Sequence, residues 1–220
     1  MIRYKKLGYV ALNVSDVARS RVWYENMVGL QFNHIVAAGE VYLRADADHH
    51  SLVLYQSDRP GLQRVAWQLE ADEQIQVLTD TLDRHQVAWR ALSEAECAAT
   101  GMRHTIRMTE PVAGTTVYCF GSGMPQMDTP FQPTVANLQF LCHIGIGTPH
   151  FRQAVEFYEQ VLNFRTSDEI DGRIRLMRCF PNPLHHSLAL APAPVNILHH
   201  FNLMVDGPDD LIRARTLYRQ

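Results

Sequence analysis

The sequence has few cysteines, and their spacing is not that of a metal-binding or disulfide-forming set. The four cysteines, Cys97, Cys119, Cys142 and Cys179, include no CxxC pair, so we predict neither a disulfide framework nor a zinc knuckle. An excess of basic residues is missing too, because the formal charge is −3 and no basic stripe appears. Nucleic acid and anionic membranes are therefore not expected partners.

Long apolar runs are also missing. A membrane-spanning helix needs about 20 consecutive apolar residues, and the runs in this sequence are much shorter. The start, MIRYKKLGYVAL, leads directly into an alternating strand pattern without a small-residue cleavage site, which argues against a signal peptide. We therefore predict a cytoplasmic protein. At 220 residues and 46% hydrophobic content, the chain can form one large domain or two modest ones.

What the sequence does contain is an internal repeat. The stretch LGYVALNVSDVARSRVWYENMVGLQF (7–32) aligns with LCHIGIGTPHFRQAVEFYEQVLNFRT (141–166). Each copy predicts a strand with alternating side chains, then a capped amphipathic helix. Farther along, a histidine doublet that opens a strand occurs twice, as HHSLVLYQ (49–56) and HHSLALAP (185–192). Matches in the same order at a nearly constant offset indicate a duplicated module.

The repeat predicts an α+β fold made of tandem strand–helix–strand–strand–strand (βαβββ) units. The first module, residues 1–122, contains two such units, at about 5–56 and 62–120. A linker with three prolines follows and marks the module boundary. The second module, residues 138–220, has one complete unit and then only a strand at 199–205 and a helix after it.

By analogy with the first module, about 35 further residues holding three strands should follow that last helix. Without them the second sheet would have an open apolar face and an unpaired edge, which soluble proteins avoid. We therefore expect the second module to be truncated in this sequence, with strands supplied by a partner as the alternative. An unpaired edge also favours a homo-oligomer.

The start LCHIGIG, the stretch AVEFYEQVLNFRTSD and the segment HHSLALAP…LHHFNLMVDGPDDLIRA resemble the vicinal oxygen chelate superfamily, which has the glyoxalase/bleomycin resistance/dioxygenase fold. Within it, the chain resembles the two-module type I extradiol catechol dioxygenases over its whole length. The resemblance implies a structural first module without a metal site. It implies a catalytic second module that holds Fe(II), occasionally Mn(II), through two histidines and a glutamate. The implied reaction is ring cleavage of a small aromatic diol with O₂.

The family motif can be carried over onto three histidines. His143 and His200 match the two metal ligands, and His186 matches an acid–base catalyst that does not bind the metal. His199 stays open as the alternative to His200, because a shift of one residue moves a strand side chain to the opposite face. Two imidazoles and one carboxylate would form a facial triad with open positions. A further imidazole suits proton transfer near neutral pH.

The first module lacks this set of residues. Its first ligand position holds Tyr9, and its second holds Val65, or Arg64 if the alignment shifts by one. The carboxylate position holds Tyr118, and the repeat offset then puts the expected glutamate at about position 253, outside this sequence. None of the glutamates near the second module's first helix is a good substitute: Glu156, Glu159 and Glu169.

Two other functions stay open. A metal-dependent, glyoxalase-like isomerase would generally take ligands from both modules or from paired chains, and Tyr9 and Val65 argue against that. A non-catalytic small-molecule-binding protein is the third hypothesis, and it applies if the chain truly ends at residue 220. The sequence determines neither the substrate-binding residues nor which catechol is cleaved.

Overall fold

The structure is a computed structural model that describes residues 1–36, 39–121 and 123–219. Residues 122 and 220, where the two predicted modules end, lie outside the described residues. Strands and helices follow one another in the duplicated order that the sequence predicts. Within the described residues, no helix is both long and apolar enough to cross a bilayer.

The first module consists of two βαβββ units that share one sheet. The first unit contains β1 (Tyr4–Val14), α1 (Val17–Trp23), η1 (Tyr24–Val28), β2 (Gln31–Ile35), β3 (Val41–Arg44) and β4 (Leu52–Gln56). The second contains β5 (Gly61–Leu69), α2 (Glu73–Arg84), β6 (Trp89–Ala91), α3 (Glu94–Thr100), β7 (Thr105–Thr109) and β8 (Thr116–Phe120). The strand order is β2-β3-β4-β1-β5-β8-β7-β6, with β1 and β5 antiparallel at the centre.

The short helix α3 is an addition that the repeat does not predict. It begins with a capping box, in which Ser93 and Glu96 satisfy each other's backbone N–H groups, as expected for a helix start. It ends at Gly101, whose φ of 69° is the left-handed conformation that favours glycine.

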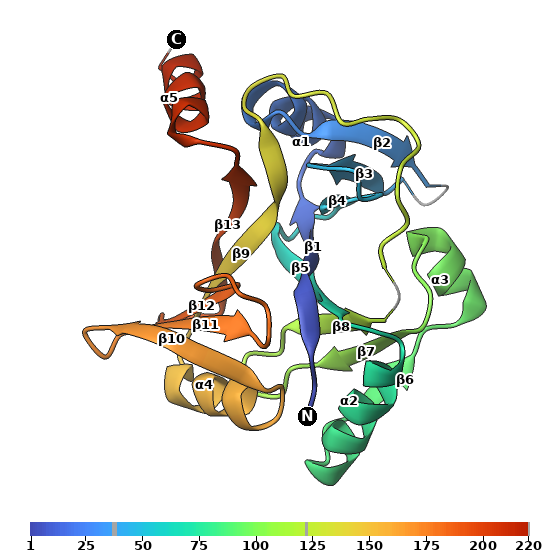
Figure 1. The fold of residues 1–220 in the computed structure, drawn as a ribbon, viewed down its shortest axis with the longest axis vertical. Helices are drawn as coiled ribbons and strands as arrows, with labels where there is room; N and C mark the ends of the chain where they lie inside the picture. The colour runs from blue at the N-terminus through green and yellow to red at the C-terminus, as the bar shows by residue number, and fades with distance from the viewer. Residues whose placement is uncertain (37–38, 122, 220) are drawn as a thin grey trace.

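The second module repeats this arrangement in part. It contains β9 (Leu138–Thr148), α4 (Phe151–Gln160), β10 (Phe164–Ile170), β11 (Ile174–Cys179), β12 (Leu188–Pro192), β13 (Ile197–Val205) and α5 (Pro208–Leu217). The order β10-β11-β12-β9-β13 copies that of β2-β3-β4-β1-β5. In Figure 1, β13 and α5 lie at one edge of the molecule, beyond β9. Within the described residues, no strand pairs with the outer edge of β13, whereas β5 pairs there with β8.

One hydrophobic core joins the two modules. Trp67 of β5 packs edge-on against Phe164 of β10, with ring centroids 4.9 Å apart, and Tyr4 of β1 contacts both rings. Ile144 of β9 belongs to this core. Because side chains alternate along a strand, its neighbour His143 points to the other face of the sheet. The core therefore fixes which face of the second sheet carries the predicted histidines.

The helices α2 and α4 are amphipathic and bury one face in this core. In α4 the buried side chains follow helical spacing and are Ala154, Val155, Phe157 and Tyr158. In α2 they include Leu78 and Leu82. The helix α5 differs, because Leu211 and Ile212 are 59% and 62% exposed. The described residues contain no strand beyond β13 against which these side chains can pack.

Candidate functional site

His143 and His200 meet across two neighbouring strands. His143 lies on β9 and His200 on β13, and the two strands are antiparallel. Their Nε2 atoms are 2.9 Å apart. The glycine between them in the ladder makes this approach feasible: Gly145 is the register partner of His200, and a Cβ at Gly145 would lie only 2.7 Å from Cε1 of His200. The site therefore requires glycine at residue 145 as well as the imidazoles of His143 and His200.

His186 completes the group of histidines. It lies between β11 and β12, next to buried Ser187, and its ring centroid is 4.4 Å from that of His143. Its neighbour His185 is exposed, and the Nδ1 atoms of the two are 3.0 Å apart. The structure therefore brings all three predicted histidines together on one face of the second sheet.

All three imidazoles have a lowered pKa, although His143 and His186 are only partly buried and His200 is exposed. Desolvation, followed by the nearby His186 and His200, lowers the pKa of His143 to about 4. Desolvation also lowers the pKa of His186, with His185 as the next cause, and the pKa of His200, with His199 as the next cause. A neutral imidazole has one nitrogen lone pair to offer to a cation or a proton. At neutral pH the three rings are therefore in the form that can bind a metal or accept a proton.

The two Nε2 atoms fit two positions of a divalent metal site, because imidazole nitrogen suits first-row metals. Among the described residues, no group of three or more His, Cys, Asp or Glu side chains has the arrangement to hold a metal. Glu159 accepts a hydrogen bond from Thr166, and Glu169 pairs with Arg175. Both glutamates therefore have other partners.

Gly145→Ala is expected to weaken divalent-cation binding by about tenfold or more, since the added methyl displaces the ring of His200. Titration with Co(II), followed by visible absorption, measures this effect. The matched control is Gly207→Ala, because Gly207 has extended backbone and nothing near its missing Cβ. Unchanged Co(II) affinity in a folded Gly145→Ala variant would contradict the placement of His200 in the site.

In the first module, an arginine occupies the place of His200. Arg64 of β5 is the register partner of Ala11, as His200 is the partner of Gly145. The register therefore aligns Arg64, and not Val65, with His200. Val65 instead belongs to the hydrophobic core.

Arg64 is held by tyrosines. It is only 4% exposed and donates hydrogen bonds to the hydroxyls of Tyr9 (2.8 Å) and Tyr55 (2.5 Å). Its guanidinium carbon lies 4.8 Å from the ring centroid of Tyr118. Tyr9, Arg64 and Tyr118 thus converge as the three ligand positions of the repeat predict. The guanidinium group of Arg64, which is positively charged, occupies the position in the first module that corresponds to the predicted metal position of the second.

Arg64→Met is expected to lower the free energy of unfolding by about 3 kcal/mol, because the buried hydroxyl of Tyr9 and the partly buried hydroxyl of Tyr55 lose a charged hydrogen-bond partner. Urea denaturation measures this loss. Co(II) affinity should not change, since the sequence predicts no metal ligand in the first module. The exposed Arg59 offers a control, and Arg59→Met should shift stability by no more than about 0.5 kcal/mol. Equal stability of the two variants would show that the tyrosine cluster does not need the cation.

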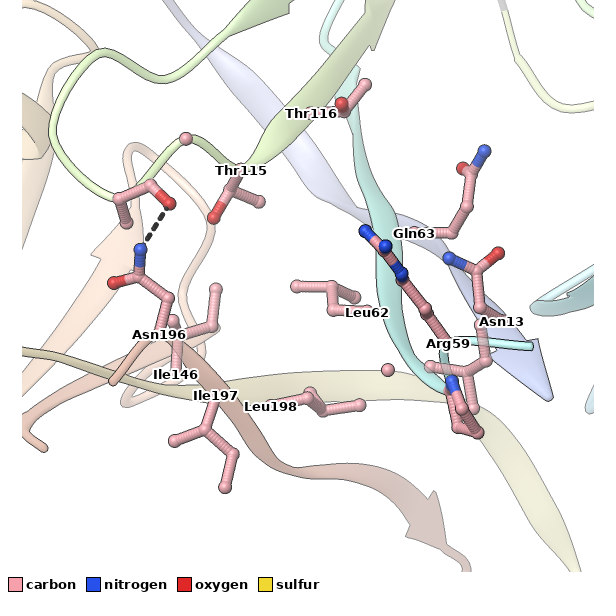
Figure 2. Close-up of a pocket in the computed structure, with 15 residues that line it drawn as sticks. Asn13, Arg59, Leu62, Gln63, Thr115, Thr116, Ile146, Asn196, Ile197 and Leu198 are labelled. Atoms are coloured by element: carbon pink, nitrogen blue, oxygen red, sulfur yellow. Dashed lines mark hydrogen bonds between the residues drawn. The ribbon is translucent and has the colours of Figure 1, made fainter. Parts of the chain in front are cut away.

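Two hollows lie near the histidine cluster, and His200 lines one of them. One, of about 700 Å³, lies between β5, β8 and β13. Figure 2 shows Asn13, Arg59 and Gln63 on one side of it and Asn196 on the other, where Asn196 donates a hydrogen bond to the carbonyl of Ala113. The second hollow, of about 580 Å³, lies between α5, β13 and η1 and is largely apolar. His199 and His200 line the second hollow, whereas His143, His186 and Gly145 line neither.

Comparison with known proteins agrees with this arrangement. Residues 6–110 and 141–218, one stretch in each module, match the Glyoxalase/Bleomycin resistance protein/Dioxygenase superfamily. The chain belongs to this superfamily. The resemblance and the α+β fold class predicted from the sequence are therefore confirmed.

Several proteins with similar sequences or structures are dioxygenases by name, and one similar structure is a Mn(II)-bound glyoxalase from Novosphingobium aromaticivorans. A 1,2-dihydroxynaphthalene dioxygenase of Sphingobium xenophagum is 24% identical over 238 residues, which cover all of this chain and 78% of that protein. An iron-dependent extradiol dioxygenase of Rhodococcus jostii is 23% identical and aligns with 94% of this chain and 74% of its own length. A halotolerant catechol dioxygenase has the same fold, with a TM-score of 0.90 at 23% identity over 99% of this chain and 75% of its own.

Proposed function

We propose that this protein is an extradiol dioxygenase, which cleaves the ring of a catechol-type aromatic diol with O₂ at a non-haem Fe(II) site. The observation that carries the proposal is the convergence of His143 and His200, with their Nε2 atoms 2.9 Å apart and His186 beside them. The names of the relatives support the same reaction. Two imidazoles and a carboxylate with open positions are typical of non-haem Fe(II) oxygenases, and one relative is named an iron-dependent extradiol dioxygenase, which favours Fe(II) over Mn(II).

In this proposal the two modules have different roles. Residues 1–122 form a structural module, because Arg64 and its tyrosines fill the place of the metal. Residues 138–220 belong to the catalytic module. The strand that would carry a third ligand, the counterpart of β8, is not among the described residues. Homo-oligomer formation and a cytoplasmic location stay predictions from the sequence.

The histidines divide the chemistry between them. His143 and His200 would hold the metal through Nε2, each with its proton on Nδ1. When bound, the metal supplies Lewis acidity and open positions that bring the diol and O₂ together. His186 would take a proton from a diol hydroxyl and later return it, since a neutral imidazole near the substrate can act as base and then as acid.

The proposal is tested on the intact native protein. Its mass is measured first, because a glutamate ligand at about position 253 requires residues beyond Gln220. Iron content and O₂ uptake with catechol are then measured after anaerobic purification. We expect about one Fe(II) per chain and O₂ uptake that depends on catechol. Stoichiometric metal without O₂ uptake from any catechol would favour the isomerase hypothesis, and absence of metal would contradict the proposal.

A further inference from the structure

His199 contacts the neighbouring His200 in a way that a regular strand does not allow. The Nδ1 atoms of the two rings are 3.2 Å apart, although successive side chains of a strand normally point to opposite faces. The strand β13 is irregular at this point. Leu198 is opposite Ile146 and His200 is opposite Gly145, so His199 is the extra residue of a β-bulge. Bulges redirect side chains, and they are frequent beside active sites.

The first module has the same bulge with a different residue pair. Leu62 is opposite Leu12 and Arg64 is opposite Ala11, so Gln63 is the extra residue of β5. Gln63 accepts a hydrogen bond through Oε1 from Nη1 of Arg64 at 2.9 Å. In both modules, therefore, the side chain of the bulge residue lies within hydrogen-bond distance of the next side chain along the strand. That next residue is His200 in the second module and Arg64 at the equivalent position of the first.

The direction of the His199–His200 hydrogen bond follows from the chemistry of the site. His200 presents Nε2 to His143, and Nε2 can bind a cation only when the ring carries its proton on Nδ1. That Nδ1–H points at Nδ1 of His199, which must then be the acceptor. His199 is exposed, so its own Nε2–H can donate to water.

We propose that His199 is a positioning residue for the metal site. It accepts a hydrogen bond from Nδ1–H of His200, which fixes the tautomer and the ring orientation in which Nε2 of His200 faces the site. This role rests on the proposed function, because it needs a metal held by His143 and His200. Mutation of a residue that hydrogen-bonds to a metal-binding histidine typically weakens metal affinity by about 10–100-fold. His199 is thus not a substitute for His200 as ligand but its support.

The test compares an acceptor with a non-acceptor at residue 199. Co(II) is titrated into the intact metal-free protein and into His199→Leu and His199→Gln, and visible absorption and calorimetry report the affinity. We expect His199→Leu to weaken Co(II) binding by about 10–100-fold. His199→Gln copies the acceptor that Gln63 provides in the first module, so its affinity should stay within about threefold of the wild type.

Two controls separate positioning from general structural damage. Gln63→Leu makes the same change at the matching bulge of the first module, and it should leave Co(II) affinity unchanged. Melting temperatures of the metal-free variants at residue 199 should stay within about 2 °C of the wild type, since the residue is exposed. Equal Co(II) affinities for His199→Leu and His199→Gln would overturn the positioning role.

Failure of the proposed function gives a different result. Absence of Co(II) binding by the wild-type protein, or binding that survives His143→Ala, would contradict the site itself and the role of His199 with it. Wild-type binding that requires His143 but is indifferent to residue 199 would leave the proposed function standing and overturn only the positioning role.

Discussion

His143→Ala is expected to remove the metal and the ring-cleaving activity together. His143 supplies one of two imidazole nitrogens that converge at 2.9 Å, and alanine cannot replace that nitrogen. His143 also contacts His186, with ring centroids 4.4 Å apart, so its loss leaves the proposed proton-transfer residue without its neighbour. Iron content after anaerobic purification and O₂ uptake with catechol measure the two effects. Retention of stoichiometric iron would contradict the assignment of His143 as ligand.

The matched control is the equivalent position of the first module. Tyr9→Phe removes a hydroxyl that accepts a hydrogen bond from Arg64, which should lower stability but leave iron content near that of the wild type. Val65→Ala lies in the core of the same module and should likewise change stability alone. Loss of iron in either variant would indicate a site shared between modules, as in the isomerase hypothesis.

His186→Ala is expected to keep the iron and still bind catechol, but to lower turnover by about 10²–10⁴-fold, which is the usual contribution of a positioned proton-transfer group. The partly buried ring of His186 lies beside that of His143, where it can reach a diol bound between the site histidines. Steady-state O₂ uptake gives the turnover, and anaerobic catechol titration gives the binding constant. Loss of iron from this variant would show that His186 is a ligand.

His185→Ala provides the comparison within the same doublet. The side chain of His185 is exposed, and it meets His186 only through the Nδ1 contact of 3.0 Å. Removal of this side chain should therefore reduce turnover by less than tenfold, about the value of one lost hydrogen bond. Equal losses in the two variants would mean that the doublet acts as a unit and that the assignment to His186 alone is wrong.

The sequence left His199 open as the alternative to His200 at the second ligand position, because a local pattern of alternating side chains cannot distinguish the two. Alternation along a strand distinguishes odd from even positions, but a single bulge reverses the alternation beyond it. The repeat offset is 134 residues for Tyr9 and His143 but 136 both for the histidine doublets at 49 and 185 and for Arg64 and His200. The backbone register confirms the alignment of Arg64 with His200 and makes His199 the extra residue.

The sequence also did not predict that Gly145 provides space for the ring of His200. A glycine in HIGIG reads as a weak point of a strand, and the repeat gives it only Ala11 as a counterpart. Its role appears when His200, 55 residues later in the chain (145 to 200), packs its ring over the missing Cβ. The same holds for Arg64, whose three tyrosines come from β1, β4 and β8.

The sequence by itself predicted the duplicated βαβββ order and the amphipathic helix α4, which follow from periodicity and from a repeated motif. The three histidines of the second module were pointed out by the resemblance to the superfamily. The tertiary structure decided the register of β13 against β9, the bulge at His199, the space at Gly145 and the cation in the first module. These depend on which strands pair and where each ladder slips, and pairing between distant segments is set by the packing of the whole core.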